Sequence, residues 1–192
     1  MVVLSKGEQT RAKLRAAAIA VFARRGYHDT KVSDIVQEIG VSQPTFYSYF
    51  ESKEAAYEEL VLDFRQRLQA LTRSLLIADN PPPERVVERV AYSFRRFLDF
   101  LAEDPALTEI GFFQPPGCTV TKEGMVRWVA ANIAKEQESG LFRTDVPARH
   151  IARCLVGIVG QMARAAGSGE PRDILALSAA EIFCGGVWIC PR

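Results

Sequence analysis

A twenty-residue stretch near the N-terminus, KVSDIVQEIGVSQPTFYSYF (residues 31–50), constrains the fold more than any other part of the chain. Its first half places four apolar residues, from Val32 to Ile39, at spacings of three and four, which is one face of a short α-helix. Gly40 ends that helix, because glycine accepts a positive φ angle at little cost. Ser42 can then cap a second helix. Two helices joined by a tight glycine-containing turn form a helix-turn-helix motif.

The second helix of this motif, roughly Gln43 to Tyr49, has one apolar and one polar side. Phe46 and Phe50 can anchor the apolar side in a small core, and the second helix of such a motif normally enters the DNA major groove. Side chains that can contact base edges gather at its start: Ser42, Gln43, Pro44 and Thr45. Three side chains suit phosphate oxygens: Tyr47 and Ser48 in this helix, and Thr30 just before the first helix of the motif. The alternative is that these residues form the solvated side of an ordinary helix.

About a dozen positions between residues 26 and 53 resemble the N-terminal signature of tetracycline-repressor (TetR) type transcriptional regulators. They are Gly26, Tyr27, Thr30, Val32, Ile35, Gly40, Val41, Ser42, Phe46, Tyr47, Tyr49, Phe50 and Lys53. The resemblance implies an all-α fold, with a three-helix DNA-binding head on a longer helical body that dimerises and holds a small-molecule pocket. It also implies that Lys53 contacts the DNA backbone; the alternative is a surface lysine.

The chain departs from the commonest family pattern at two places. Val36 and Ile39 stand where small alanines are usual, and Gln43-Pro44 stands where a basic residue and glycine are frequent. The first departure affects how closely the two helices can approach. The second leaves the operator sequence open.

The charge distribution fits a head that meets phosphate and a body that does not. Residues 1–53 hold eight Lys/Arg against five Asp/Glu, a local net charge of +3, whereas the whole chain has +1. The rest of the chain is therefore slightly acidic. Local positive charge of this kind favours nucleic-acid contact at the N-terminal end.

Membrane, secretion, metal and cofactor signals are missing from the sequence. It has no run of 18 or more apolar residues, and its N-terminus lacks a secretion signal, so we expect a cytoplasmic protein. The four cysteines show no C-x-x-C spacing, and with only two histidines we expect no metal site and no cofactor. They are expected to be buried apolar residues in a reducing compartment. A redox-responsive regulator that uses Cys184 and Cys190 is an alternative.

Apolar periodicity predicts further helices, about nine in all. Their expected ranges are 6–25, 52–78, 83–104, 121–139, 147–167 and 171–189, with a short segment at 105–113 and a mobile loop at the turn cluster 114–117. We expect two domains, a DNA-binding head at 1–52 and an effector-binding and dimerisation body at 53–192.

Aromatic and sulfur-containing side chains are dense in the middle third of the chain. In the family such residues often line the effector cavity, and the expected set is Tyr92, Phe97, Phe100, Phe112, Phe113, Met125 and Trp128. A stripe of aromatics at helical spacing also fits plain core. Apolar walls would favour a hydrophobic or aromatic effector.

The last two helices are apolar on more than one side, which predicts that they bury surface beyond a single neighbour. The family's usual four-helix dimer interface would use Ile151, Leu155, Ile158, Met162, Ile182 and Phe183. Burial within one subunit is the alternative.

No enzyme is expected, because no nucleophile, base and orienting residue can be assembled and no phosphate-binding glycine loop is present. The resemblance, together with the helix-turn-helix pattern, implies a homodimeric regulator, a repressor that a small effector releases from a pseudo-palindromic double-stranded DNA operator. A helical protein-interaction module without DNA affinity is the alternative.

Overall fold

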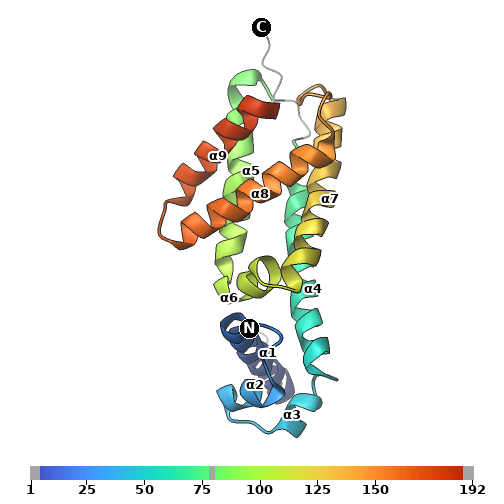
Figure 1. Cartoon of the computed structure of the whole chain (residues 1–192), viewed down its shortest axis with the longest axis vertical. Helices are drawn as coiled ribbons and strands as arrows, with labels where there is room; N and C mark the ends of the chain where they lie inside the picture. The colour runs from blue at the N-terminus through green and yellow to red at the C-terminus, as the bar shows by residue number, and fades with distance from the viewer. Residues whose placement is uncertain (1–4, 78–80, 188–192) are drawn as a thin grey trace. The chain divides into compact units, whose positions relative to one another are not determined.

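The computed structural model describes residues 5–77 and 81–187, and these residues form an all-α fold (Figure 1). The described part contains nine α-helices and one π-helical segment, so the predicted fold class is confirmed. In chain order they are α1 (Lys6–Arg25), α2 (Val32–Ile39), α3 (Gln43–Tyr47), α4 (Lys53–Ser74), α5 (Pro83–Glu103), α6 (Pro105–Thr108), η1 (Glu109–Phe113), α7 (Gly117–Glu138), α8 (Ala148–Gly167) and α9 (Arg172–Val187).

The chain packs as two compact units. The first consists of the described residues up to Gln66 together with Pro105–Thr121, and the second of Arg67–Asp104 and the described residues from Lys122 onward. The long helices α4 and α7 each supply residues to both units. The first unit thus takes in 14 of the 22 residues of α4 and a distant segment, where the sequence alone suggested a boundary after residue 52.

Local signals set the helix ends of the first unit. Ser5 and Glu8 form a capping box at the start of α1, in which each side chain accepts a hydrogen bond from the other's backbone amide. Gly26 ends α1 with a φ of 81°, and Gly40 ends α2 in the left-handed conformation with a φ of 67°. The predicted ends of α1 at Lys6 and Arg25 are therefore confirmed.

Within the first unit, two polar side chains connect the segment 105–121 to the N-terminal helices and α4. The Tyr57 hydroxyl donates to the Ile110 carbonyl at 3.2 Å and accepts from the Gly117 amide at 3.1 Å. Burial raises the pKa of this hydroxyl, which keeps its proton available for donation. Gln114 donates to the carbonyl of Ala23 at 3.0 Å. The turn cluster 114–117, expected to be a mobile loop, is thus held at both ends.

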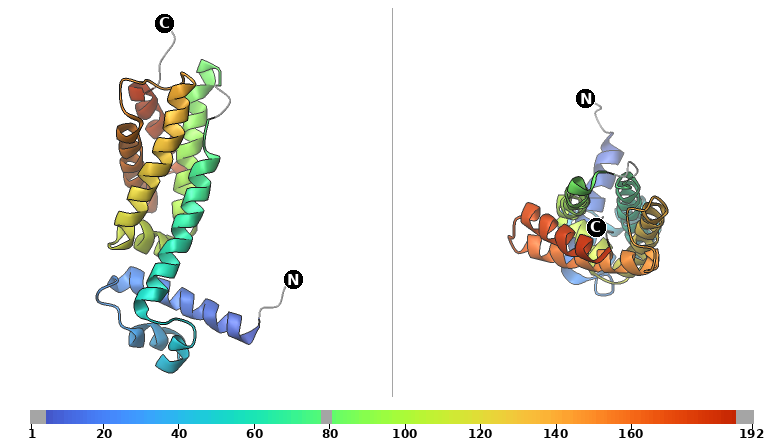
Figure 2. Two further views of the ribbon diagram at one scale, coloured as in Figure 1. Left: turned by 90° about the vertical axis from the view of Figure 1, so that its right-hand side faces the viewer. Right: turned by 90° about the horizontal axis from the view of Figure 1, so that it is seen from above.

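Helices α5, α8 and α9 pack against one another in the second unit (Figure 2). Their buried side chains interlock around aromatic rings: Phe94 of α5 and Phe183 of α9 meet edge-on, with ring centroids 5.9 Å apart, and Phe142 meets the same Phe183 ring at 6.1 Å. Such edge-to-face pairs add to the stabilisation from apolar burial.

Candidate nucleic-acid interface and body cavity

The short helix α3 is held by two phenylalanines on one side and leaves its other side open. Phe46 is fully buried and Phe50 is 5% exposed, with their ring centroids 5.3 Å apart. Ser42 caps the helix by accepting from the Thr45 amide at 3.4 Å, as the sequence predicted. Because five residues make too little helix to be stable alone, this anchoring determines where the exposed side chains lie.

The residues predicted to contact bases differ in their freedom. Gln43 and Pro44 are exposed and lie in the first turn of α3. Ser42 is also exposed, but its hydroxyl lies 2.9 Å from that of Thr45, which is only half-exposed. Gln43, which makes no hydrogen bond through its side chain to any described residue, is therefore the side chain best placed to bond a base edge.

The residues predicted to contact phosphate fall into two groups. Tyr47 is 52% exposed, and Ser48 is exposed with its hydroxyl donating to the Pro44 carbonyl at 3.0 Å. Thr30, in contrast, is 1% exposed, and its hydroxyl donates to the Gly26 carbonyl at 2.7 Å. The Thr30 side chain thus closes the turn between α1 and α2 and does not face solvent.

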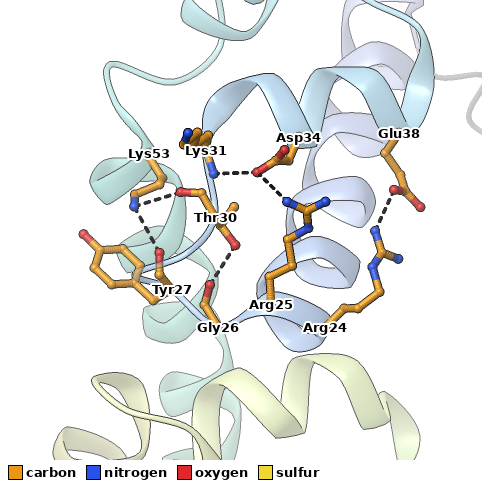
Figure 3. Close-up of polar contacts among 9 residues, drawn as sticks. All are labelled: Arg24, Arg25, Gly26, Tyr27, Thr30, Lys31, Asp34, Glu38 and Lys53. Atoms are coloured by element: carbon orange, nitrogen blue, oxygen red, sulfur yellow. Dashed lines mark hydrogen bonds and ion pairs between the residues drawn. The ribbon is translucent and has the colours of Figure 1, made fainter.

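Lys53 is also committed to this turn, as Figure 3 shows. Its ammonium group donates to the carbonyls of Tyr27 and Thr30, both at 3.0 Å, and lies 4.5 Å from the centroid of the Tyr27 ring. These contacts fix the start of α4 against the turn that precedes α2. One of the three ammonium hydrogens remains for a phosphate oxygen.

Most arginines of the first unit are neutralised by carboxylates, whereas Lys31 is not. Arg24 pairs with Glu38 at 2.8 Å and Arg25 with Asp34 at 3.2 Å (Figure 3). Lys31 is exposed, and its side chain makes no ion pair with any described residue. It stands at the N-cap of α2, where the free amides of a helix start favour an anion. Lys31 was not among the predicted phosphate contacts, although a lysine directly before an amphipathic helix is a signal for one.

Comparison with known proteins identifies the family. Residues 14–60 match the sequence profile of "Bacterial regulatory proteins, tetR family". The chain is 41% identical over 155 residues to the uncharacterized HTH-type transcriptional regulator YdgC of Bacillus subtilis, covering 81% of this chain and 80% of that protein. This chain belongs to the TetR family. Such proteins are transcriptional regulators and are not enzymes.

Other relatives and solved structures agree with this family. The HTH-type transcriptional regulator EthR of Mycolicibacterium smegmatis is 28% identical over 153 residues, which are 78% of this chain and 70% of EthR. A tetR-family bacterial regulatory protein from Rhodococcus RHA1 has the same fold, with a TM-score of 0.76, 18% identity and coverage of 98% of this chain and 100% of that one. The structure of KstR2 from Mycobacterium tuberculosis has a TM-score of 0.71 at 23% identity, covering 98% and 97%.

The second unit of this TetR-family chain contains a partly open apolar cavity, whose empty space of about 470 Å³ includes open solvent at its mouth. Of the seven residues expected to line an effector pocket, only Phe97 does so. Tyr92 is 51% exposed, Phe100 faces a shallow surface hollow between α4 and α5, Phe112 and Phe113 belong to the first unit, and Met125 and Trp128 lie elsewhere on α7. The walls come instead from other apolar residues, among them Phe94, Phe142 and Phe183, with one acid, Glu136.

The residues expected at a dimer interface differ in how far they are exposed on the single chain. Ile151 and Phe183 are 2% and 5% exposed, so one chain already covers them. Leu155, Ile158 and Met162 are half-buried, and Ile182 is 68% exposed. Ile174 and Leu177 of α9, which were not among the six predicted interface residues, are also 63% and 48% exposed.

The cysteine chemistry disfavours a redox switch. Cys184 is buried, and burial raises the pKa of its thiol to about 11, the reverse of what a reactive thiolate needs. Cys190 lies outside the described residues. Within the described part, no group of three or more His, Cys, Asp or Glu side chains could hold a metal ion, and no helix is long and apolar enough to cross a membrane.

Proposed function

We propose that this TetR-family regulator is a homodimeric repressor that reads a pseudo-palindromic operator with α3. A single observation carries the proposal: Gln43, Pro44 and Tyr47 stand exposed on a helix whose opposite side is fixed by the buried ring of Phe46. Rigid presentation of this kind is what a base-reading helix requires. In this proposal Tyr47, Ser48, Lys53 and Lys31 contact phosphates, and Ser42 and Thr45 support Gln43 and Pro44 at the bases.

The proposal also assigns the body cavity to a small, largely apolar effector that releases the operator. Helix α4 supplies Tyr57 to the first unit and Thr72 to the cavity wall of the second, so one continuous helix belongs to both. An effector that binds one state of this helix better than another shifts the population toward that state. Release of the operator then requires no other connection between the effector cavity and the DNA-binding helices.

DNA recognition can be tested by selecting bound sequences from random duplex DNA and measuring affinity on the selected operator. Gln43→Ala should change which DNA sequence is preferred, and Tyr47→Ala should lower the affinity for all DNA sequences alike. Gln66→Ala, an exposed glutamine about 20 Å along α4 from Lys53 by helix rise, is the matched control. An equal loss on every operator variant for Gln43→Ala would reject its base-reading role.

The interaction-module alternative differs in its salt dependence. A dimer that contacts several phosphates loses affinity steeply as salt rises, because each contact releases a condensed counterion. A flat salt response, or no binding to any duplex at low salt, would reject the regulator proposal in favour of that alternative.

Dimerisation through α8 and α9 can be tested by sedimentation. The open apolar side of α9 supports the assignment, because exposed apolar residues that share one face mark an interaction surface. Ile182→Glu should dissociate the dimer at micromolar concentration. Leu62→Glu, at a similarly exposed leucine on α4, should leave it intact. A dimer that survives Ile182→Glu would place the interface elsewhere.

A further inference from the structure

The body cavity has walls that offer an effector almost no polar partner. Its aromatic side is built by the rings of Phe94, Phe97, Phe142 and Phe183, which come from α5, α9 and the segment after α7. Valine, leucine and isoleucine side chains fill most of the remainder. Such walls favour ligands with a large apolar surface, and only the few polar groups among them can select the polar head group of a ligand.

Three of the four polar side chains that line the cavity already donate a hydrogen bond to a backbone carbonyl. The Thr72 hydroxyl donates to the Leu68 carbonyl at 2.8 Å, and the Ser93 hydroxyl to the Arg89 carbonyl at 3.2 Å. Asn132 donates to the Thr72 carbonyl at 2.8 Å. The first two bonds lie within α4 and within α5, and the third joins α7 to α4, so one donor hydrogen of each side chain is already used.

Glu136 is the exception. Its side chain is 4% exposed, and it is the one charged residue among the buried side chains of the described chain. One carboxyl oxygen accepts from the Ile77 amide at 3.0 Å, and the other has no hydrogen-bond or ion-pair partner among the described residues. A buried carboxylate normally has a cationic partner or several donors, because burial without them is costly. Burial raises the pKa of this carboxyl to about 7, because it destabilises the charged form relative to the protonated form.

We propose that the cavity binds a lipophilic amine, whose protonated nitrogen pairs with Glu136 while its apolar body lies against the phenylalanine rings. The ammonium supplies the positive charge that the carboxylate lacks, and charge-assisted hydrogen bonds of this type are the strong ones. The inference rests on the proposed function only in treating the bound amine as the effector.

Other head groups fit the cavity less well. A carboxylate or phosphate would meet Glu136 as a like charge, and no lysine, arginine or histidine of the described chain lines the cavity to offset it. An alcohol can donate one hydrogen bond to Glu136 but brings no charge. The chemistry of the lining therefore ranks amine above alcohol and alcohol above acid.

Calorimetric titration of the full chain at pH 7.5 tests this ranking with three ligands of one skeleton: 2-phenylethylamine, 2-phenylethanol and phenylacetate. The amine should bind at least tenfold more tightly than the alcohol, and phenylacetate more weakly than both. Glu136→Gln should weaken the amine at least tenfold and leave the alcohol within about threefold. Glu138→Gln, an exposed glutamate two residues along, is the matched control and should bind the amine as the unmodified chain does.

Three results would overturn the inference: no binding by any of the ligands, an alcohol or acid as tight as the amine, or an undiminished affinity of Glu136→Gln for the amine. Circular dichroism of Glu136→Gln confirms that the variant is folded. Operator binding measured on the same preparation separates the two proposals. A chain that binds DNA but no amine refutes this inference alone, whereas a chain that binds the amine but no duplex refutes the regulator proposal.

Discussion

Replacing Glu136 by glutamine should remove one component of the pH dependence of the stability of the unliganded chain. The substitution keeps the size of the side chain and its carbonyl oxygen, which can still accept from the Ile77 amide. It removes the titrating proton. Any pH dependence that disappears in the variant therefore belongs to Glu136.

The sign follows from the direction of the pKa shift. The pKa of Glu136 is raised in the folded chain to about 7 from an ordinary value of 4.5, so the folded state holds the proton more tightly than the unfolded state. Stability from this group is present in full below pH 4.5 and is lost as pH rises toward 7. Its neighbours do not obscure the effect, because no other charged side chain from α4, α5, α7, α8 or α9 lines the cavity in the described chain.

The magnitude follows from the size of the shift. Each pKa unit corresponds to about 1.4 kcal/mol, so a shift of this size gives a full effect of about 3 kcal/mol, most of it between pH 5 and 8. The free energy of unfolding of Glu136→Gln, relative to the unmodified chain, should thus rise by about 2–3 kcal/mol over that interval. The new amide group also alters the free energy of unfolding, but by the same amount at every pH, so it does not affect the comparison.

Urea unfolding at pH 5, 6, 7 and 8 measures this quantity, with the protein concentration held fixed because dimerisation also contributes to apparent stability. Glu138→Gln, which is exposed, serves as the control and should follow the unmodified chain. A difference between Glu136→Gln and the unmodified chain that stays constant within about 0.5 kcal/mol across this range would refute the argument for a destabilised buried carboxylate.

Three further substitutions test the first unit. Lys53→Met should lower the free energy of unfolding by about 1–3 kcal/mol in urea, because two carbonyls of the turn before α2 lose their donor, and an unchanged stability with weaker DNA binding would instead make Lys53 a pure phosphate contact. Tyr57→Phe should cost about 1–2 kcal/mol in the same assay and speed hydrogen exchange at Gly117, whose amide loses its acceptor; unaltered exchange would contradict this. Gly111→Ala should cost about 1–3 kcal/mol, since a Cβ there would lie 2.7 Å from the Phe64 ring, and a neutral result would mean that the ring can move aside.

Short-range sequence signals predicted the helices of this chain well. Gly26 and Gly40 end their helices with positive φ angles, Ser42 caps α3, and Pro83 begins α5. Each of these effects acts within one turn of helix, so the sequence alone contains it.

Side-chain direction needed the tertiary structure. Lys53 and Thr30 both looked like phosphate contacts, yet both bond to carbonyls of the turn between α1 and α2. The two carbonyls that Lys53 reaches come from residues more than twenty positions earlier, and no local rule states where such a distant acceptor will lie, whereas Thr30 bonds to Gly26 only four residues away. Composition likewise does not state which aromatic side chains meet in space: one of the seven predicted aromatic and sulfur-containing residues lines this cavity.

Glu136 shows where the limit lies. It continues the buried stripe of Val129 and Ile133 at helical spacing, so the sequence already placed an acid on an apolar face of α7. What the sequence could not state is that Ile77, nearly sixty residues earlier, gives this carboxyl one hydrogen bond and that four phenylalanines line the same cavity. Helix periodicity is a property of neighbours along the chain, whereas a cavity is made by side chains that only folding brings together.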